Sequence, residues 1–333
     1  MVIFIKIINK KNFSLRNFFL FFYVCDIIKI GDNKMKVLCI GHTAYDITVL
    51  TDGYPKENVK YRVEKRIECG GGPASNAAYL LGKWGVKTYI ASVVGNDIYG
   101  KRIKKEFTDV GVDTTYLELS NKYKTTSSFI IVNKKNASRT LFTYRNPQMR
   151  MNDIDINIKP DFILVDAQEL ELSLKMIKKY PKAVTILDAG RAKYANIKLG
   201  KVVDYLVTSR NFAEDFTGIK IDINDINSLN KVYASLEKDF KSHIVITLEE
   251  HGCLYKEDGV VKLMPGYKVV AKDTTGAGDI FHGAFVYALM NKYSYADVMR
   301  ISNIAGALSV KEIGGRYSVP DLKEVLRIYG KSK

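Results

Sequence analysis

The sequence predicts an α/β fold: a doubly wound, mostly parallel sheet with helices on both faces. Short apolar segments of strand length alternate with longer helical segments along most of the chain. Two glycine-rich loops lead directly into helical patterns, as is common where a strand of such a sheet is followed by a helix. The 333 residues are 47% hydrophobic, enough to bury one large core, and no internal repeat or low-complexity linker divides them. We therefore expect one domain.

The predicted strands of the large sheet are short and strongly apolar. They cover residues 37–40, 88–94, 162–165, 184–187, 205–208 and 244–248. Their alternation with helical segments favours parallel pairing. Two further β-type segments, near residues 61–68 and 127–144, break this alternation, and the second is interrupted by a polar turn.

The first 34 residues differ in character from the rest of the chain. The apolar run from Phe18 to Cys25 ends at Asp26, too soon for a membrane span, and no small-residue cleavage site follows it. Met35 stands directly before the first predicted strand. We expect that translation naturally starts at Met35, that residues 1–34 are a leader outside the fold, and that the domain covers residues 35–330.

Charge and cysteine content exclude several other classes of protein. The formal net charge is +15, of which the first 34 residues contribute +4, and the remaining +11 is spread along the chain. Without a concentrated basic arm or a recognised motif, we expect no nucleic-acid partner, and the charge can instead attract anionic nucleotides. The four cysteines show no C-x-x-C spacing, so we expect neither zinc nor disulfides, and a reducing cytoplasm as the location.

The loop from Asp273 to Asp279 carries the clearest chemical signal. Gly276 and Gly278 precede an apolar helical pattern, so the unpaired N–H groups of the first helical turn can hold an anion that no side chain keeps away. Asp279 would stand within a turn of that anion and could accept a proton from an attacking hydroxyl. This pattern suggests phosphoryl transfer to an alcohol. The alternative is an ordinary loop with a helix-capping residue.

A second glycine-rich loop lies far upstream. Gly70, Gly71 and Gly72 precede Pro73 and a second helical pattern. Three consecutive glycines cost chain entropy, which a close backbone approach to a polyhydroxylated ligand would justify. Asn76 offers a donor and an acceptor for sugar hydroxyls, and its alternative role is helix capping or turn formation.

With these two loops, residues 36–326 resemble the ribokinase-like (pfkB-type) carbohydrate kinases. Asn211 and Glu214 match the family's N-x-x-E motif, associated with magnesium and phosphate positioning. Residues 247–252 resemble its nucleotide-contacting T-L-G-x-x-G turn, with Glu249 in place of the usual glycine. The resemblance implies a ribokinase-like fold in which a small sheet, from about 45–70 and 116–146, forms a lid.

The resemblance also implies roles for individual residues. The catalytic centre would consist of Asp279 as base and the backbone donors of Gly276, Ala277 and Gly278. The sugar would be bound by Asp46, Gly71, Gly72 and Asn76. The nucleotide would be contacted by Asn211, Glu214, Thr247, Glu249, Gly252 and Asn303. A monovalent cation, K⁺, would be held by Asp273, Thr275, Val310, Ile313, Gly315 and Ser318, largely through carbonyl oxygens.

The activity implied is that of an ATP-dependent, magnesium-requiring sugar kinase that phosphorylates a hydroxyl of a small carbohydrate. Pro73 stands where ribokinases proper usually carry a lysine, so the resemblance does not name ribose as the sugar. A nucleoside kinase of the same fold is one alternative. A catalytically silent sugar-binding regulator is another, disfavoured because Asp279, Asn211 and Glu214 are all present. We expect a small-molecule sugar and ATP as partners, no membrane partner, and a homodimer formed through the lid.

Overall fold

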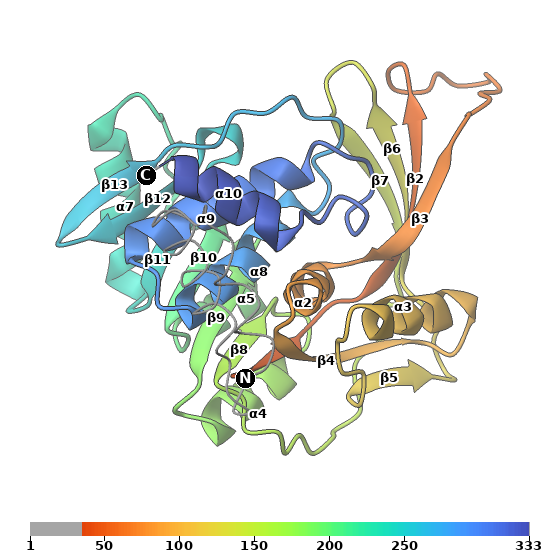
Figure 1. The fold of residues 1–333 in the computed structure, drawn as a ribbon, viewed down its shortest axis with the longest axis horizontal. Helices are drawn as coiled ribbons and strands as arrows, with labels where there is room; N and C mark the ends of the chain where they lie inside the picture. The colour runs from red at the N-terminus through yellow and green to blue at the C-terminus, as the bar shows by residue number, and fades with distance from the viewer. Residues whose placement is uncertain (1–34, 333) are drawn as a thin grey trace, which may run out of the picture. The chain divides into compact units, whose positions relative to one another are not determined.

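Residues 35–332 of the chain are described by a computed structural model, and they contain two β-sheets with helices around the larger one (Figure 1). The expectations for the leader, residues 1–34, lie outside these described residues. Strand β1 begins at Lys36, directly after Met35, as the apolar pattern predicts. No helix within residues 35–332 is both long and apolar enough to cross a bilayer.

The large sheet has nine strands in the order β13-β12-β11-β10-β9-β8-β1-β4-β5. The strands are β1 (Lys36–Ile40), β4 (Lys87–Gly95), β5 (Leu117–Ser120), β8 (Phe162–Val165), β9 (Val184–Ala189), β10 (Tyr205–Ser209), β11 (His243–Thr247), β12 (Cys253–Glu257) and β13 (Val260–Met264). The pairs β11–β12 and β12–β13 are antiparallel, and the other pairs are parallel. The predicted doubly wound, mostly parallel sheet is confirmed.

Helices cover both faces of this sheet (Figure 1). One face carries α2 (Pro73–Lys83), α3 (Ile98–Asp109), α8 (Ala277–Met290), α9 (Tyr295–Ser309) and α10 (Leu322–Lys331); the other carries α4 (Leu170–Lys179), α5 (Tyr194–Gly200), α6 (Arg210–Thr217) and α7 (Ile226–Asp239). Alternate residues of a strand point to opposite faces. Accordingly, Val37 and Cys39 of β1 lie in the core under α2 and α8, whereas Leu38 and Ile40 lie in the core on the other side.

The small sheet has four strands in the order β3-β2-β6-β7. They are β2 (Ala44–Thr51), β3 (Arg66–Gly71), β6 (Ser127–Asn133) and β7 (Arg139–Tyr144). Two expected boundaries differ from the structure: the start of the second lid segment at 116 and the start of the β-type segment near 61. Strand β5 pairs with β4 and buries Leu117 in the core of the large sheet, so the segment from 116 does not begin the small sheet. Residues 61–65 are exposed loop, because apolar packing on the sheet starts only at Ile67.

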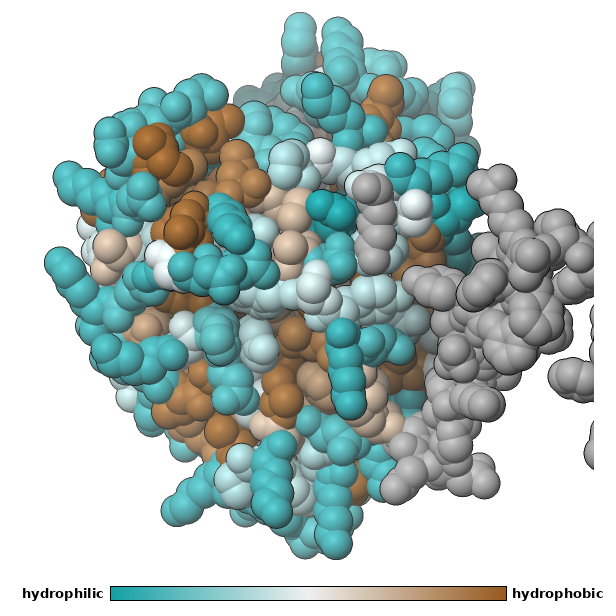
Figure 2. Space-filling view, turned by 60° about the vertical axis from the view of Figure 1, so that its left-hand side comes forward, coloured by the Kyte–Doolittle hydropathy of each residue, from teal (hydrophilic) through white to brown (hydrophobic). Residues whose placement is uncertain are grey.

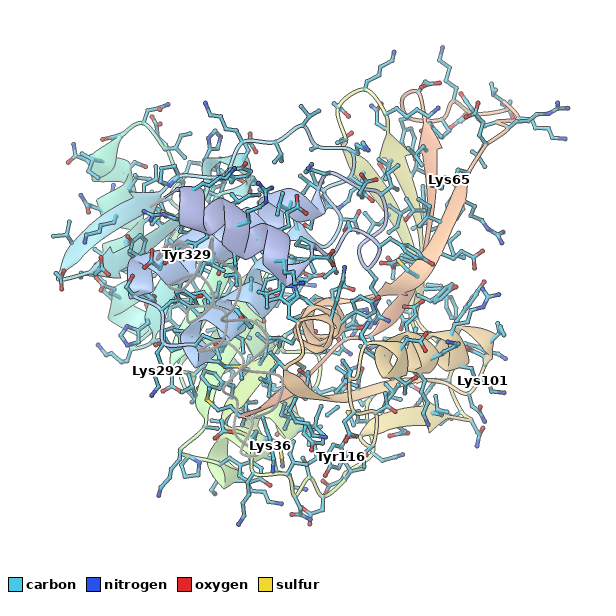
Figure 3. All side chains as sticks on the ribbon, in the orientation of Figure 1. Lys36, Lys65, Lys101, Tyr116, Lys292 and Tyr329 are labelled. Carbon is cyan, nitrogen blue, oxygen red and sulfur yellow. The ribbon has the colours of Figure 1, made fainter. Side chains whose placement is uncertain are left out.

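Charged side chains are distributed over the surface of this domain. The labelled Lys65, Lys101 and Lys292 in Figure 3 are exposed and come from well-separated parts of the fold. The face shown in Figure 2 alternates hydrophilic side chains with smaller hydrophobic patches. The positive charge of the domain is therefore dispersed over many elements.

Candidate functional site

The N-terminus of α8 forms a cradle of backbone donors. The helix begins at Ala277, and Gly276 before it is left-handed with φ 80°, a conformation that favours glycine. The N–H of Ile280 donates to the carbonyl of Gly276 (2.9 Å), so the N–H groups before it have no carbonyl four residues earlier within the helix. No atom lies within 4 Å of the place where a Cβ on Gly278 would stand. An anion can therefore approach these N–H groups closely.

Asp279 stands in the first turn of α8 and is tied to the second glycine-rich loop. Asn76 on α2 donates from Nδ2 to Asp279 Oδ2 at 2.8 Å, across 203 residues of sequence. Asn76 is buried, and its Oδ1 has no hydrogen-bond partner. A Cβ on Gly276 would lie 3.3 Å from Asn76 Nδ2, so glycine lets the two loops approach. The structure thus brings the two predicted motifs together.

Burial tunes the acidity of Asp279. The residue is partly exposed, but protein surrounds its carboxyl group, and this loss of solvent raises its pKa to about 7. The nearby Asp188 carboxyl raises the pKa further, whereas the Asn76 hydrogen bond and His282 lower it. A carboxylate with a pKa near the working pH is suited to general-base catalysis.

Asp46 lies on β2 and faces the end of β3. Its carboxylate occupies the space where a Cβ on Gly71 would stand, at 2.0 Å from Oδ2, so any other residue at position 71 would displace it. Burial raises the pKa of Asp46 to about 6, although a hydrogen bond with Ser128 and the charge of Arg316 act in the opposite direction. Gly72 follows β3 and is the N-cap of α2. Asp46, Gly71 and Gly72 therefore lie where β3 leads into α2, the helix that carries Asn76.

Sequence reasoning did not single out Asp166, which follows β8. Its Oδ2 accepts hydrogen bonds from the backbone N–H groups of His42 (2.7 Å) and Ala74 (3.1 Å), and Oδ1 accepts from Gln168 N (3.0 Å). Asp166 thus ties the turn after β1 to the start of α2. An available signal was its position directly after an apolar strand, because ligands of α/β sheets gather at the carboxyl ends of parallel strands.

A small cavity of about 10 Å³ lies beside this carboxylate. His42, Arg145, Gln168 and Glu169 are among its lining residues. The Arg145 guanidinium donates to Gln168 Oε1. Burial raises the pKa of Glu169 to about 7, and burial together with Arg145 lowers the pKa of His42 to about 4. The cavity has room for about one water molecule.

The predicted nucleotide residues lie at the carboxyl ends of β10 and β11 and beside β13. Asn211 is exposed at the start of α6, and Thr247 ends β11 with its hydroxyl on the carbonyl of Thr208 (3.2 Å). Glu214 on α6 accepts from Lys220 Nζ (2.6 Å) and Ile221 N (3.1 Å), so both carboxylate oxygens bind within the protein. Asn303 on α9 donates from Nδ2 to the carbonyls of Met264 and Pro265 (3.2 Å each). Their contacts with a nucleotide stay predictions.

Glu249 adopts a backbone conformation that normally favours glycine. Its φ is 50°, and it begins a short 3₁₀ turn that Gly252 ends. Glu249 Oε2 lies 3.1 Å from Nε of Arg210, the first residue of α6. This ion pair does not have hydrogen-bond geometry, and Nε and Nη2 of Arg210 are buried without a hydrogen-bond acceptor.

The predicted cation residues are brought together by two loops. Asp273 accepts from Thr275 N (2.9 Å) and from Gly314 N (3.0 Å), and Val310 O accepts from the N–H of Asp273 (3.2 Å). The Thr275 hydroxyl is buried without a partner. Ser318 donates to Gly315 O (3.1 Å), and Ile313 lies in the same loop. Carbonyl and hydroxyl oxygens are ligands that a hard monovalent cation prefers, and its binding here stays a prediction. Among residues 35–332, no group of three or more His, Cys, Asp or Glu side chains is arranged to hold a metal ion.

Comparison with known proteins agrees with this geometry. Residues 34–322 match the pfkB family of carbohydrate kinases. The chain is 29% identical to the ribokinase of Staphylococcus aureus over 304 residues, which covers 88% of this chain and 99% of the relative, and 29% identical to that of Haemophilus influenzae over 266 residues, covering 77% and 86%. The Arabidopsis thaliana ribokinase complexed with ribose and ATP shares the fold, with a TM-score of 0.75, 23% identity, and coverage of 89% of this chain and 98% of that one. The chain therefore belongs to the pfkB family of carbohydrate kinases.

Proposed function

We propose that this carbohydrate kinase transfers the γ-phosphoryl group of ATP to a hydroxyl of a small sugar, with Asp279 as the general base. The observation that supports this most directly is the position of Asp279, in the first turn of α8 directly after the glycine cradle and hydrogen-bonded to Asn76. The similarity to proteins named as ribokinases, one of them complexed with ribose and ATP, supports the pair of substrates.

The sugar side of the site offers groups that can bind hydroxyls. Asp46 provides a buried carboxylate, and Asn76 provides Oδ1, a buried acceptor without a partner. A buried polar atom that stays unsatisfied costs about 1–3 kcal/mol, so a bound hydroxyl that donates to Oδ1 is favoured. The absence of a side chain at Gly71 and Gly72 leaves room for the Asp46 carboxylate and the His42 carbonyl. A polyol fits this combination of acceptors.

In the transfer step, the sugar oxygen forms a bond to the γ-phosphorus while the bond from that phosphorus to the ADP oxygen breaks. Asp279 accepts the hydroxyl proton, and the backbone N–H groups of residues 276–278 donate to the phosphoryl oxygens as their charge develops. Asn211 and Glu214 on α6 would hold the hydrated shell of a magnesium ion bound with the nucleotide, and this ion would neutralise part of the charge. The protein contributes chiefly position and preorganised dipoles.

An ADP-release assay over aldoses, ketoses and nucleosides tests this function, with Asp279→Asn as the key variant. The carboxamide keeps the shape but cannot take the proton, so kcat should fall by about 10²–10⁴ while ATP and sugar affinities change little. Asp109→Asn, an exposed change on α3, is the matched control and should keep full activity. Near-normal kcat in Asp279→Asn would show that the base is misassigned, and turnover of nucleosides alone would contradict the sugar assignment.

A further inference from the structure

His282 lies beneath the first turn of α8 and has hydrogen-bond acceptors at both ring nitrogens. Its side chain is buried, with 3% of the residue exposed. Nδ1 lies 2.6 Å from the carbonyl oxygen of Gly278 and 3.2 Å from Oδ2 of Asp188 on β9. Nε2 lies 3.1 Å from the carbonyl oxygen of Val207 on β10. The ring therefore joins the glycine cradle to two central strands of the large sheet.

These contacts define where the proton of the pair resides. A carbonyl oxygen can only accept, so favourable contacts at both nitrogens require a hydrogen on each of them. Burial lowers the pKa of His282 and raises that of Asp188, whereas the carbonyls of Gly278 and Val207 and the charge of Asp279 act in the opposite direction on the ring. The two side chains are in contact, however, and they share one titratable proton, which can lie either on the Asp188 carboxyl group or on the second nitrogen of the His282 ring. The carbonyls of Gly278 and Val207 place that proton on the ring, which makes His282 an imidazolium beside an ionised Asp188.

We propose that the His282 imidazolium, paired with Asp188, is a positioning group that holds the first turn of α8 against β9 and β10 and so orients the glycine cradle and Asp279. This inference rests on the proposed role of Asp279 as base. His282 acts through the Gly278 carbonyl, one residue before Asp279 in the chain. Loss of its second proton would leave one carbonyl facing a nitrogen lone pair, and the turn would shift.

The ionisable groups around the pair come from three elements. Asp279 lies on α8 itself, Asp188 on β9, and Asp166 at the end of β8 acts on both Asp188 and Asp279 through its charge. From β10 the Val207 carbonyl faces the ring, and Asn76 on α2 faces Asp279. The imidazolium is thus placed among carboxylates, which favour its charged form.

Nuclear magnetic resonance can read the charge of His282 without any activity. The chain contains four histidines, so ¹⁵N-histidine labelling gives four side-chain signals, and His282→Asn assigns the one of interest. In the wild-type enzyme we expect His282 to stay in the imidazolium form up to at least about pH 8, well above its ordinary value of about 6.5. In Asp188→Asn the counter-charge is lost, and we expect the ring to become neutral at a pH lower by about 1–3 units.

Enzyme kinetics should follow the same titration. As the pH rises, kcat of Asp188→Asn should fall at a pH about 1–3 units lower than the pH at which kcat of the wild type falls. The reason is that deprotonation of His282 lets the first turn of α8 shift. A purely structural role for Asp188 would lower kcat by the same factor at every pH. His243→Asn, a change at the exposed amino end of β11, is the control and should leave the profile unchanged.

Two results would overturn the proposal. One is a His282 signal in the neutral form at pH 7 in the wild type, which stays informative even if Asp188→Asn does not fold. The other is an Asp188→Asn enzyme whose pH profile of kcat matches the wild type in shape. Failure of the base assignment is distinguishable, because Asp279→Asn would then retain kcat while the charge of His282 stays as expected.

Discussion

Asp46 is a buried carboxylate that can accept hydrogen bonds from a ligand. It is 7% exposed, and its burial outweighs the Ser128 hydrogen bond and the charge of Arg316, so its pKa rises to about 6. The opposing Gly71 leaves its oxygens room within the pocket. Sugar hydroxyls that donate to the ionised carboxylate would supply the hydrogen bonds that water provides elsewhere.

We predict that Asp46→Asn weakens sugar binding more than it slows the chemical step. Charge-assisted hydrogen bonds are worth about 1.5–3 kcal/mol, so the Kd for the sugar should rise about 10- to 100-fold, whereas kcat should fall far less than in Asp279→Asn. Isothermal titration calorimetry with the best sugar of the ADP-release panel measures the affinity.

The matched control for this variant is Asp52→Asn, an exposed change just beyond β2 that should leave the sugar affinity unaltered. The opposite pattern, a large loss of kcat with unchanged affinity, would mean that Asp46 takes part in the chemistry. The two carboxylates would then have exchanged their assigned roles.

Among larger elements, the loop of residues 310–318 is held in place by a buried arginine. Arg316 is 3% exposed; its Nη1 lies 2.6 Å from Glu106 Oε2 on α3, and its guanidinium packs 4.3 Å from the centre of the Phe107 ring. Glu106 also accepts from the N–H of Gly70 (2.9 Å). The loop is thus fixed to α3 and β3 while Asp273 binds its Gly314. A rigid frame of this kind can hold several carbonyl oxygens around one ion.

We predict that the enzyme is activated by K⁺ bound between the loops at 273–275 and 310–318. The rate in potassium chloride should exceed the rate in tetramethylammonium chloride severalfold at equal ionic strength, because only a small hard cation fits carbonyl and hydroxyl ligands. Thr275→Val removes the unpartnered hydroxyl and should raise the potassium concentration needed, whereas Thr108→Val on α3 should not. Equal rates in the two salts would contradict the site.

At the scale of the whole described domain, the small sheet presents two different faces. Asp46 and Ser128 share one face, whereas Phe129 and Phe142 are register partners on the other. Phe129, Phe142 and Tyr144 are 43%, 51% and 58% exposed, and all three lie on this second face. A cluster of exposed aromatic side chains on a sheet is typical of a surface that pairs with another protein.

We predict that two copies of the chain associate through this aromatic face. Phe142→Glu should convert a dimer into a monomer, because a charge in the centre of an apolar contact would be buried without a partner. Size-exclusion chromatography with light scattering measures the mass. Leu263→Glu on β13 changes another exposed apolar residue, away from the small sheet, and should leave the dimer intact. A wild-type monomer at every concentration would show that the aromatic face has another use.

The sequence by itself determined the local elements and the two glycine-rich motifs. Strand and helix periodicity predicted six strands of the large sheet, the start of α8 and the helix after Gly72. These features depend on neighbouring residues, since side-chain alternation, glycine conformations and helix starts are set within a few positions of the chain. The boundaries of the small sheet were less accurate, because edge strands such as β5 are distinguished only by the strand they pair with.

Tertiary structure alone decided which side chains meet. The contact of Asn76 with Asp279, the pairing of Asp188 with His282 and the burial of Arg316 against Glu106 each join residues that are far apart in the chain. No local pattern encodes these pairs, because they depend on the order β10-β9-β8-β1 in the sheet and on which helices cover each face. Nothing in the sequence distinguishes His282 from a packing residue, because one of its two carbonyl partners, that of Val207, belongs to a distant strand. Burial and long-range contact, which give these groups their charge states, arise only when the sheet has assembled.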